Sequence, residues 1–134
     1  MSDDDFLAAL ESCRLPAADF THAAHVRAGF LYLKRHDYAE ALGAMRRTIM
    51  AFAASIGKAE LYHETITVAF MTLINERMAS MVEAADWPSF EGQNGDLITG
   101  QPLAAHYTPE RLANPLARRV FLLPDRGTST QRVA

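Results

Sequence analysis

Residues 20–36, FTHAAHVRAGFLYLKRH, carry the clearest helical pattern in this chain. Asp19 or Thr21 has the chemistry of an N-cap at the start of the stretch. The apolar side chains recur every three or four residues, which is the period of one helix face. They form two overlapping series: Phe20, Ala24, Ala28 and Leu31, and Ala23, Val26, Phe30 and Leu33. The pattern predicts an amphipathic helix that reaches His36.

Helices are also expected on both sides of this segment. Ser2 and Asp5 have the spacing of a capping box and predict a short helix of about ten residues, which Pro16 ends. Asp37 begins a third helix with one broad apolar stripe. Gly57 is placed to terminate it in the left-handed conformation.

The rest of the chain predicts one long helix and then shorter ones. The longest helix is expected from about Lys58 to Val82 or Glu83, and Pro and Gly residues become frequent after it. Short helices are expected at about 109–113 and 115–122, where a capping residue precedes a proline. The predicted fold class is all-α, a bundle of four main helices with short C-terminal helices packed over it. The chain is expected to form one domain, residues 1–125, followed by a flexible tail, residues 126–134.

Composition limits the function classes. The chain has 134 residues, of which 49% are hydrophobic and 22% charged, as expected for one globular domain. Its formal net charge of −3 argues against nucleic acid as a partner. Cys13 is the single cysteine, so an internal disulfide or a Cys-based zinc finger is excluded. The most apolar stretch, Thr65 to Asn75, is too short for a membrane span. The acidic start, Met1 to Asp5, is unlike a secretory leader, so a cytoplasmic protein is expected.

Three of the five histidines are predicted to meet at one end of the bundle. His22 and His25 are three residues apart, so they share a helix face. His63 falls near the start of the fourth helix. Very short connections make consecutive helices antiparallel, so the second and fourth helices run in the same direction. His22, His25 and His63 should therefore lie at about the same level.

Such a cluster has two possible chemistries. A histidine near a helix N-terminus feels the positive end of the dipole, which favours the neutral imidazole. Neutral His22, His25 and His63 could hold a divalent metal, zinc or iron(II) by ligand type. They could instead form a metal-free acid and base pocket, in which His63 with Glu64 or Tyr62 moves protons of a small substrate. A third interpretation is that these histidines are structural or solvated.

Three further side chains are candidates for ligand contact. Tyr32 continues the helix face of His22 and His25. Arg119, next to Arg118, could hold an anionic ligand, although a surface ion pair is the simpler role. Tyr107 lies in the C-terminal segment, which either forms a lid over the bundle end or covers the core.

Other motifs are excluded or have simpler explanations. Glu60 and His63 match one Glu-x-x-His of a di-iron bundle, but the second copy is missing. Cys13 is more simply a packing residue than a nucleophile. A methionine stripe is expected in the core or on a dimer face of the fourth helix, and it contains Met45, Met71, Met78 and Met81.

Three groups of residues carry a resemblance to a known family. The groups are Phe20 to Val26 with Ala28 and Leu31 to Leu33, Tyr62 to Thr67, and Tyr107 with Ala117 to Phe121, Pro124 and Asp125. With the pattern Phe-x-His-x-x-His followed by Tyr-His-Glu-Thr, the chain resembles a family of small bacterial helical proteins without an established activity. The resemblance covers about residues 6–125. It implies that these residues belong together and supplies no substrate.

The sequence therefore predicts a small-molecule or metal-binding bundle, either a binding protein or a small enzyme. Its site would lie at the His22, His25 and His63 end, with Tyr62 and Glu64 in support. The alternative is a non-catalytic interaction or regulatory module with structural histidines. A homodimer is compatible with either function.

Overall fold

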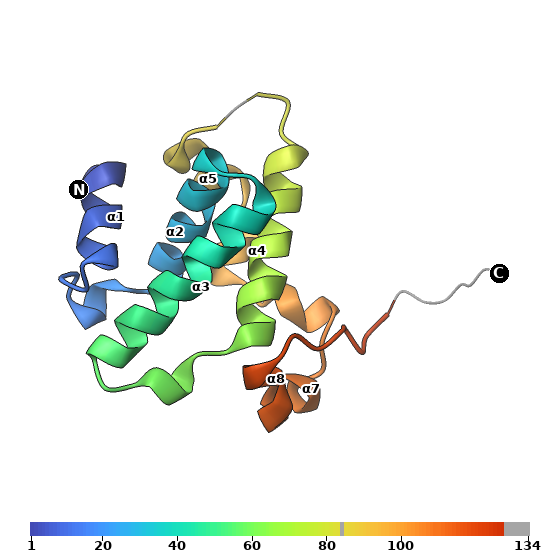
Figure 1. The fold of residues 1–134 in the computed structure, drawn as a ribbon. Helices are drawn as coiled ribbons and strands as arrows, with labels where there is room; N and C mark the ends of the chain where they lie inside the picture. The colour runs from blue at the N-terminus through green and yellow to red at the C-terminus, as the bar shows by residue number, and fades with distance from the viewer. Residues whose placement is uncertain (84, 128–134) are drawn as a thin grey trace.

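The computed structural model describes residues 1–83 and 85–127, which fold as a helical bundle with no strand in these ranges (Figure 1). The predicted all-α class is confirmed. The four main helices are α1 (Asp3–Glu11), α2 (His22–Arg35), α3 (Tyr38–Ser55) and α4 (Glu64–Ala79). Shorter helices follow: α5 (Trp87–Gln93), α6 (Gly95–Thr99), α7 (Pro109–Ala113) and α8 (Pro115–Arg119). Single 3₁₀ turns lie at η1 (Ala17–Asp19), η2 (Ala59–Leu61) and η3 (Pro102–Ala105).

Side-chain caps fix where the first three helices begin. Ser2 accepts a hydrogen bond from the Asp5 N–H at 3.1 Å, and Thr21 and Asp37 make the equivalent bonds at α2 and α3. Of the two caps considered for α2, Thr21 is the one used. Because the α2–α3 connection is short, these helices run in opposite directions, and α2 and α4 point the same way (Figure 1).

The fourth helix is shorter than the sequence predicts. It begins at Glu64 and ends at Ala79, and residues 59–61 form a separate 3₁₀ turn. The reason is local: His63 is extended (φ −131°, ψ 105°) and its side chain caps α4. The last helix is shorter as well, because Val120 is extended (φ −136°, ψ 157°) and ends α8 at Arg119.

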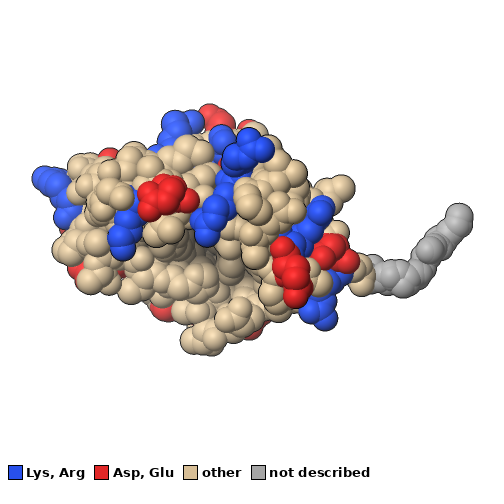
Figure 2. All heavy atoms as spheres, turned by 90° about the horizontal axis from the view of Figure 1, so that it is seen from below, with Lys and Arg blue, Asp and Glu red and all other residues tan. Residues whose placement is uncertain are grey.

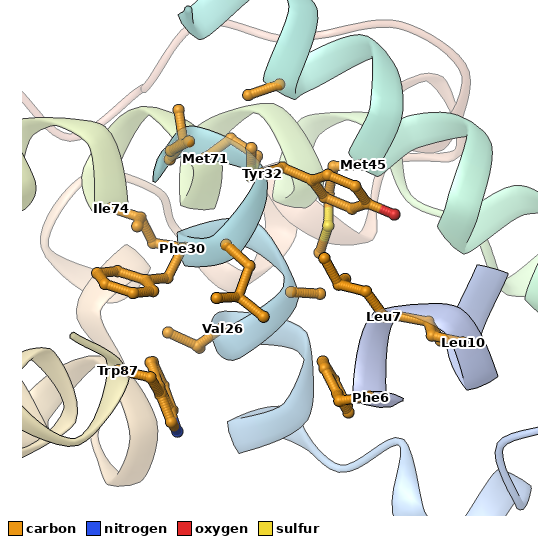
Figure 3. Packing of buried hydrophobic residues seen from close by; sticks show 14 of the residues in the cluster. Phe6, Leu7, Leu10, Val26, Phe30, Tyr32, Met45, Met71, Ile74 and Trp87 are labelled. Carbon is orange, nitrogen blue, oxygen red and sulfur yellow. The ribbon is translucent and has the colours of Figure 1, made fainter. Parts of the chain in front are cut away.

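The hydrophobic core is built around α2. Val26 and Phe30 are almost completely buried, and side chains from α1, α3, α4 and α5 approach them (Figure 3). Gly29 allows α4 to come close, because a Cβ atom there would lie 2.9 Å from Met71 Sδ and 3.0 Å from Ile74 Cδ1.

The C-terminal segment covers the bundle instead of forming a second unit. The α5 and α6 helices pack on α2, and α8 packs on α4. The fully buried Thr65 of α4 donates to the Val120 carbonyl oxygen and accepts from the Leu122 N–H, at 2.9 and 3.0 Å. These two hydrogen bonds favour the expectation that the C-terminal segment covers the core over the expectation that it forms a lid.

The first residues of the predicted tail belong to the part of the chain that the structure describes. The Arg126 N–H donates to the carbonyl oxygen of His106 at 2.9 Å. The remainder of the tail from residue 128 lies outside the described residues. Within the described ranges, none of the helices combines the length and apolar composition that crossing a membrane requires.

Candidate functional site

The main candidate site is a cavity of about 320 Å³ between α2, α3 and α4, here called the α2–α4 cavity. Most of its wall is apolar, and the histidines of α2 form a polar part. Figure 2 shows a hollow in the bundle end viewed from below, with uncharged residues below it and charged side chains along its upper edge. The lining residues are His22, His25, Val26, Met45, Ile49, Ile66, Thr67, Phe70, Met71 and Ile74.

His22, the first residue of α2, is held by two contacts. Its Nε2 atom lies 2.8 Å from the carbonyl oxygen of Leu97 in α6, so this nitrogen carries the proton and donates. Its ring packs edge to face against Phe70, with the ring centroids 5.1 Å apart. The neutral form of this tautomer leaves Nδ1 as a hydrogen-bond acceptor.

His25 lies one turn further along α2 and is held in a different way. Its Nδ1 atom donates to the Thr21 carbonyl oxygen at 2.8 Å, and its ring stacks on Phe20 with centroids 3.7 Å apart. Burial is the main cause of a lowered pKa for His25, and the neighbouring His22 lowers the pKa further, against the bond to Thr21. The neutral ring leaves Nε2 as an acceptor.

His25 and Ile49 also border a second hollow of about 210 Å³, on the side of η1 and η2. Tyr62 contributes to its wall and donates its hydroxyl to Glu64 Oε1 at 2.7 Å. Arg46 donates Nε to the same oxygen at 2.9 Å. Burial, followed by the bond to Glu64, raises the pKa of Tyr62 to about 12, so this hydroxyl stays protonated and serves as a donor.

His63 occupies a structural position. Its Nδ1 accepts from the Ile66 N–H at 3.1 Å, and its Nε2 donates to the Leu112 carbonyl oxygen at 2.8 Å. Both ring nitrogens therefore bind the protein itself, one as the cap of α4 and the other as a tie to α7. His63 does not line the α2–α4 cavity.

The expected three-histidine metal site has no support in this geometry. In residues 1–83 and 85–127, no group of three or more His, Cys, Asp or Glu side chains is arranged to hold a metal ion. The physical reason is that His63 cannot offer a lone pair while it caps α4 and donates to Leu112. The structure brings together His22 and His25 and leaves His63 apart from them.

The other predicted ligand contacts also lie away from the cavity. Tyr32 is buried and bonds Glu11 and Thr48 through its hydroxyl, at 2.6 and 2.8 Å. Tyr107 is buried in the C-terminal segment, where its hydroxyl donates to the Leu122 carbonyl oxygen at 2.8 Å. Arg119 is exposed at the end of α8.

In the sequence, most residues of the cavity wall have the pattern of an ordinary hydrophobic core. The missed residues come from the inward stripes of all three helices: Val26, Met45, Ile49, Ile66, Phe70, Met71 and Ile74. One signal in the sequence is Gly29: a glycine within a helix costs about 1 kcal/mol relative to alanine, which indicates a close neighbour or open space at this position.

Comparisons of the chain with protein-family models, with curated proteins and with solved structures found no match.

Proposed function

We propose that this protein binds a small, mainly apolar molecule in the α2–α4 cavity. The observation that carries the proposal is a cavity of about 320 Å³ with apolar walls and two histidines that contribute a few polar atoms. Small-molecule sites commonly have this composition, in which apolar surface supplies affinity and a few polar groups fix orientation.

The polar groups that the sequence suggests for proton transfer are engaged in other contacts. The ring of His63 uses both nitrogens for structural hydrogen bonds. The Glu64 carboxylate is paired with Arg46 and accepts from Tyr62. A general base needs a free lone pair within reach of the substrate. The roles predicted for His63, Glu64 and Tyr62 in proton transfer are therefore not included in this proposal.

The methionines provide a direct test. Met45 and Met71 line the cavity, whereas Met50 is exposed on α3. With ¹³C-methyl-labelled methionine, titration with toluene should shift the Met45 and Met71 signals saturably and leave Met50 unchanged. Ile49→Phe should abolish these shifts, because the larger side chain fills space next to the cavity. Equal small shifts at all methionines, or no shift, would contradict the proposal.

A second candidate, a non-catalytic interaction module, has one observation in its favour. Large apolar side chains are exposed on η2 and on and after α8: Leu61, Leu116, Val120, Phe121 and Leu123. Arg118 Nη1 donates to the Leu61 carbonyl oxygen at 2.9 Å, so these two segments adjoin. Clustered exposed apolar surface is typical of a protein contact.

A homodimer formed through this surface can be tested directly. Light scattering during size-exclusion chromatography would give the mass of the protein in solution. If the surface joins two copies, Leu116→Ser should convert a dimer to a monomer, and the exposed Met50→Ser should leave the dimer intact. A monomer at all concentrations would argue against a homodimer.

A further inference from the structure

The α2–α4 cavity has no carboxylate, ammonium or guanidinium group that would compensate a full charge. Among the described residues, its lining contains no Lys, Arg, Asp or Glu. Moving an ion from water into an apolar site costs several kcal/mol unless a counter-charge or several hydrogen bonds compensate it. While His22 and His25 are neutral, an anionic or cationic ligand is therefore disfavoured at this site.

The polar atoms that remain in the lining are acceptors. His22 and His25 each use one nitrogen to donate to a backbone carbonyl oxygen, so in the neutral rings Nδ1 of His22 and Nε2 of His25 carry lone pairs. Burial lowers the pKa of His25, which keeps this ring neutral. Thr67 offers no spare proton, because its hydroxyl already donates to the His63 carbonyl oxygen at 2.9 Å. A ligand gains hydrogen bonds here only by donating them.

The apolar part of the wall suits an aromatic ring. Met45 and Met71 contribute thioether groups, which make favourable contacts with ring edges. Phe70 already packs edge to face with His22, in the geometry that aromatic pairs prefer. The volume is sufficient, because an engineered cavity of ~150 Å³ in another protein binds benzene.

We propose that the α2–α4 cavity selects a neutral molecule with one or two aromatic rings and one hydrogen-bond donor, the chemical class of phenols and indoles. His22 or His25 accepts a hydrogen bond from the donor group of the ligand, and the apolar wall contacts its ring. This inference rests on the proposed function and adds to it the class of ligand.

The test compares phenol with toluene, which has a methyl group where phenol has its hydroxyl. Dissociation constants for both are measured from the Met45 and Met71 methyl signals. In the wild type, phenol should bind at least as tightly as toluene. His25→Phe keeps an aromatic ring beside Phe20 but removes the acceptor, so the preference for phenol over toluene should fall about 3- to 10-fold. His22→Phe tests the other acceptor in the same way.

His36→Phe is the matched control, because His36 is exposed at the far end of α2 and should leave the preference unchanged. A second measurement uses only the wild-type protein, so it does not depend on whether the variants fold. In protein with ¹⁵N-labelled histidine, phenol should shift the resonance of His25 Nε2 or His22 Nδ1 upfield. Toluene, which has no donor, should not.

The possible outcomes separate the two proposals. If toluene binds and the preference for phenol is the same in the wild type and both cavity variants, the ligand class is wrong and the binding function stands. If benzoate or benzylammonium binds more tightly than phenol, the inferred neutrality of the ligand is wrong. If neither toluene nor phenol binds the wild type, the binding function itself is contradicted.

Discussion

His63 and Leu112, which are 49 residues apart in the chain, are joined by a 2.8 Å hydrogen bond from imidazole Nε2 to the carbonyl oxygen. The other ring nitrogen caps α4 by accepting from Ile66. Replacing His63 by Ala removes both bonds. We expect the free energy of unfolding to fall by about 1–3 kcal/mol, from the loss of a cap and of a tertiary hydrogen bond. Urea denaturation followed by circular dichroism would measure it.

One further variant distinguishes the contributions of the two His63 hydrogen bonds to stability, and another serves as a control. Asn is a good cap, so His63→Asn should recover the part of the stability that comes from capping α4. His36→Ala, at an exposed site, should change the stability by no more than about 0.5 kcal/mol. A His63→Ala protein as stable as the wild type would contradict the structural role of this residue.

Thr65 fastens the C-terminal segment to α4 through its hydroxyl, which bonds Val120 and Leu122. Thr65→Val keeps the shape of the side chain but leaves the partly buried carbonyl oxygen of Val120 and N–H of Leu122 without this partner. We expect a loss of about 1–3 kcal/mol and faster trypsin cleavage after Arg118. Thr99→Val is the control, because its exposed hydroxyl bonds only within α6. Equal cleavage rates in the two variants would rule out this fastening role.

The helices that local chemistry specifies could be predicted from the sequence. Ser2, Thr21 and Asp37 are common capping residues in front of periodic apolar segments, and each caps the helix expected of it. The start of α4 could not be found in this way, because its cap is a histidine. The position of His63 depends partly on its bond to Leu112, and a contact between such distant segments leaves no local pattern.

The α5 helix was missed although its start has a local signal. Asp86 precedes Trp87 and Pro88 and accepts from the Ser89 N–H at 2.9 Å. The same combination of a cap and a proline correctly predicted α7 and α8. At α5 the high glycine content of the following residues argues against a helix, although Gly92 lies within the helix.

The candidate site was predictable in part. The helical period places His22 and His25 on one face of α2, and both line the cavity. The cavity itself was not predictable, because the same apolar stripes would fill a closed core if the side chains met fully. Whether Met45, Met71 and Ile49 leave space depends on helix separation and side-chain conformation, which a single sequence does not specify.

The lowered pKa of His25 gives a prediction about pH. Because burial lowers the pKa of His25 in the folded state below the ordinary value of 6.5, the unfolded chain binds a proton more readily. The contribution of His25 to stability is fully present above pH 6.5 and is lost as the pH falls through the folded-state pKa. His25→Gln cannot titrate, so its free energy of unfolding should fall less between pH 7.5 and pH 5 than that of the wild type.

Denaturation curves at the two pH values would measure this difference. His36→Gln, at an exposed position, is the matched control and should show the same fall as the wild type. His22, the titratable neighbour that acts on His25, remains present in both variants. If His25→Gln and His36→Gln lose the same stability on acidification, His25 does not contribute to the pH dependence.

Gly29 links helix packing to the cavity. Ala at this position would gain about 1 kcal/mol in helix propensity. Its Cβ, however, would lie 2.9 Å from Met71 Sδ and 3.0 Å from Ile74 Cδ1, so both side chains must shift away from α2. Because Met71 and Ile74 line the cavity, we expect Gly29→Ala to weaken toluene binding and to change the free energy of unfolding by less than about 1 kcal/mol.

Gly92→Ala is the control, because nothing lies within 4 Å of a Cβ there. It should raise the free energy of unfolding by about 0.5–1 kcal/mol through helix propensity alone and leave toluene binding unchanged. Methionine-methyl NMR and urea denaturation would measure both quantities on the same samples. If Gly29→Ala stabilises the protein as much as Gly92→Ala and binds toluene as the wild type does, then the close approach of Met71 to α2 does not set the size of the cavity.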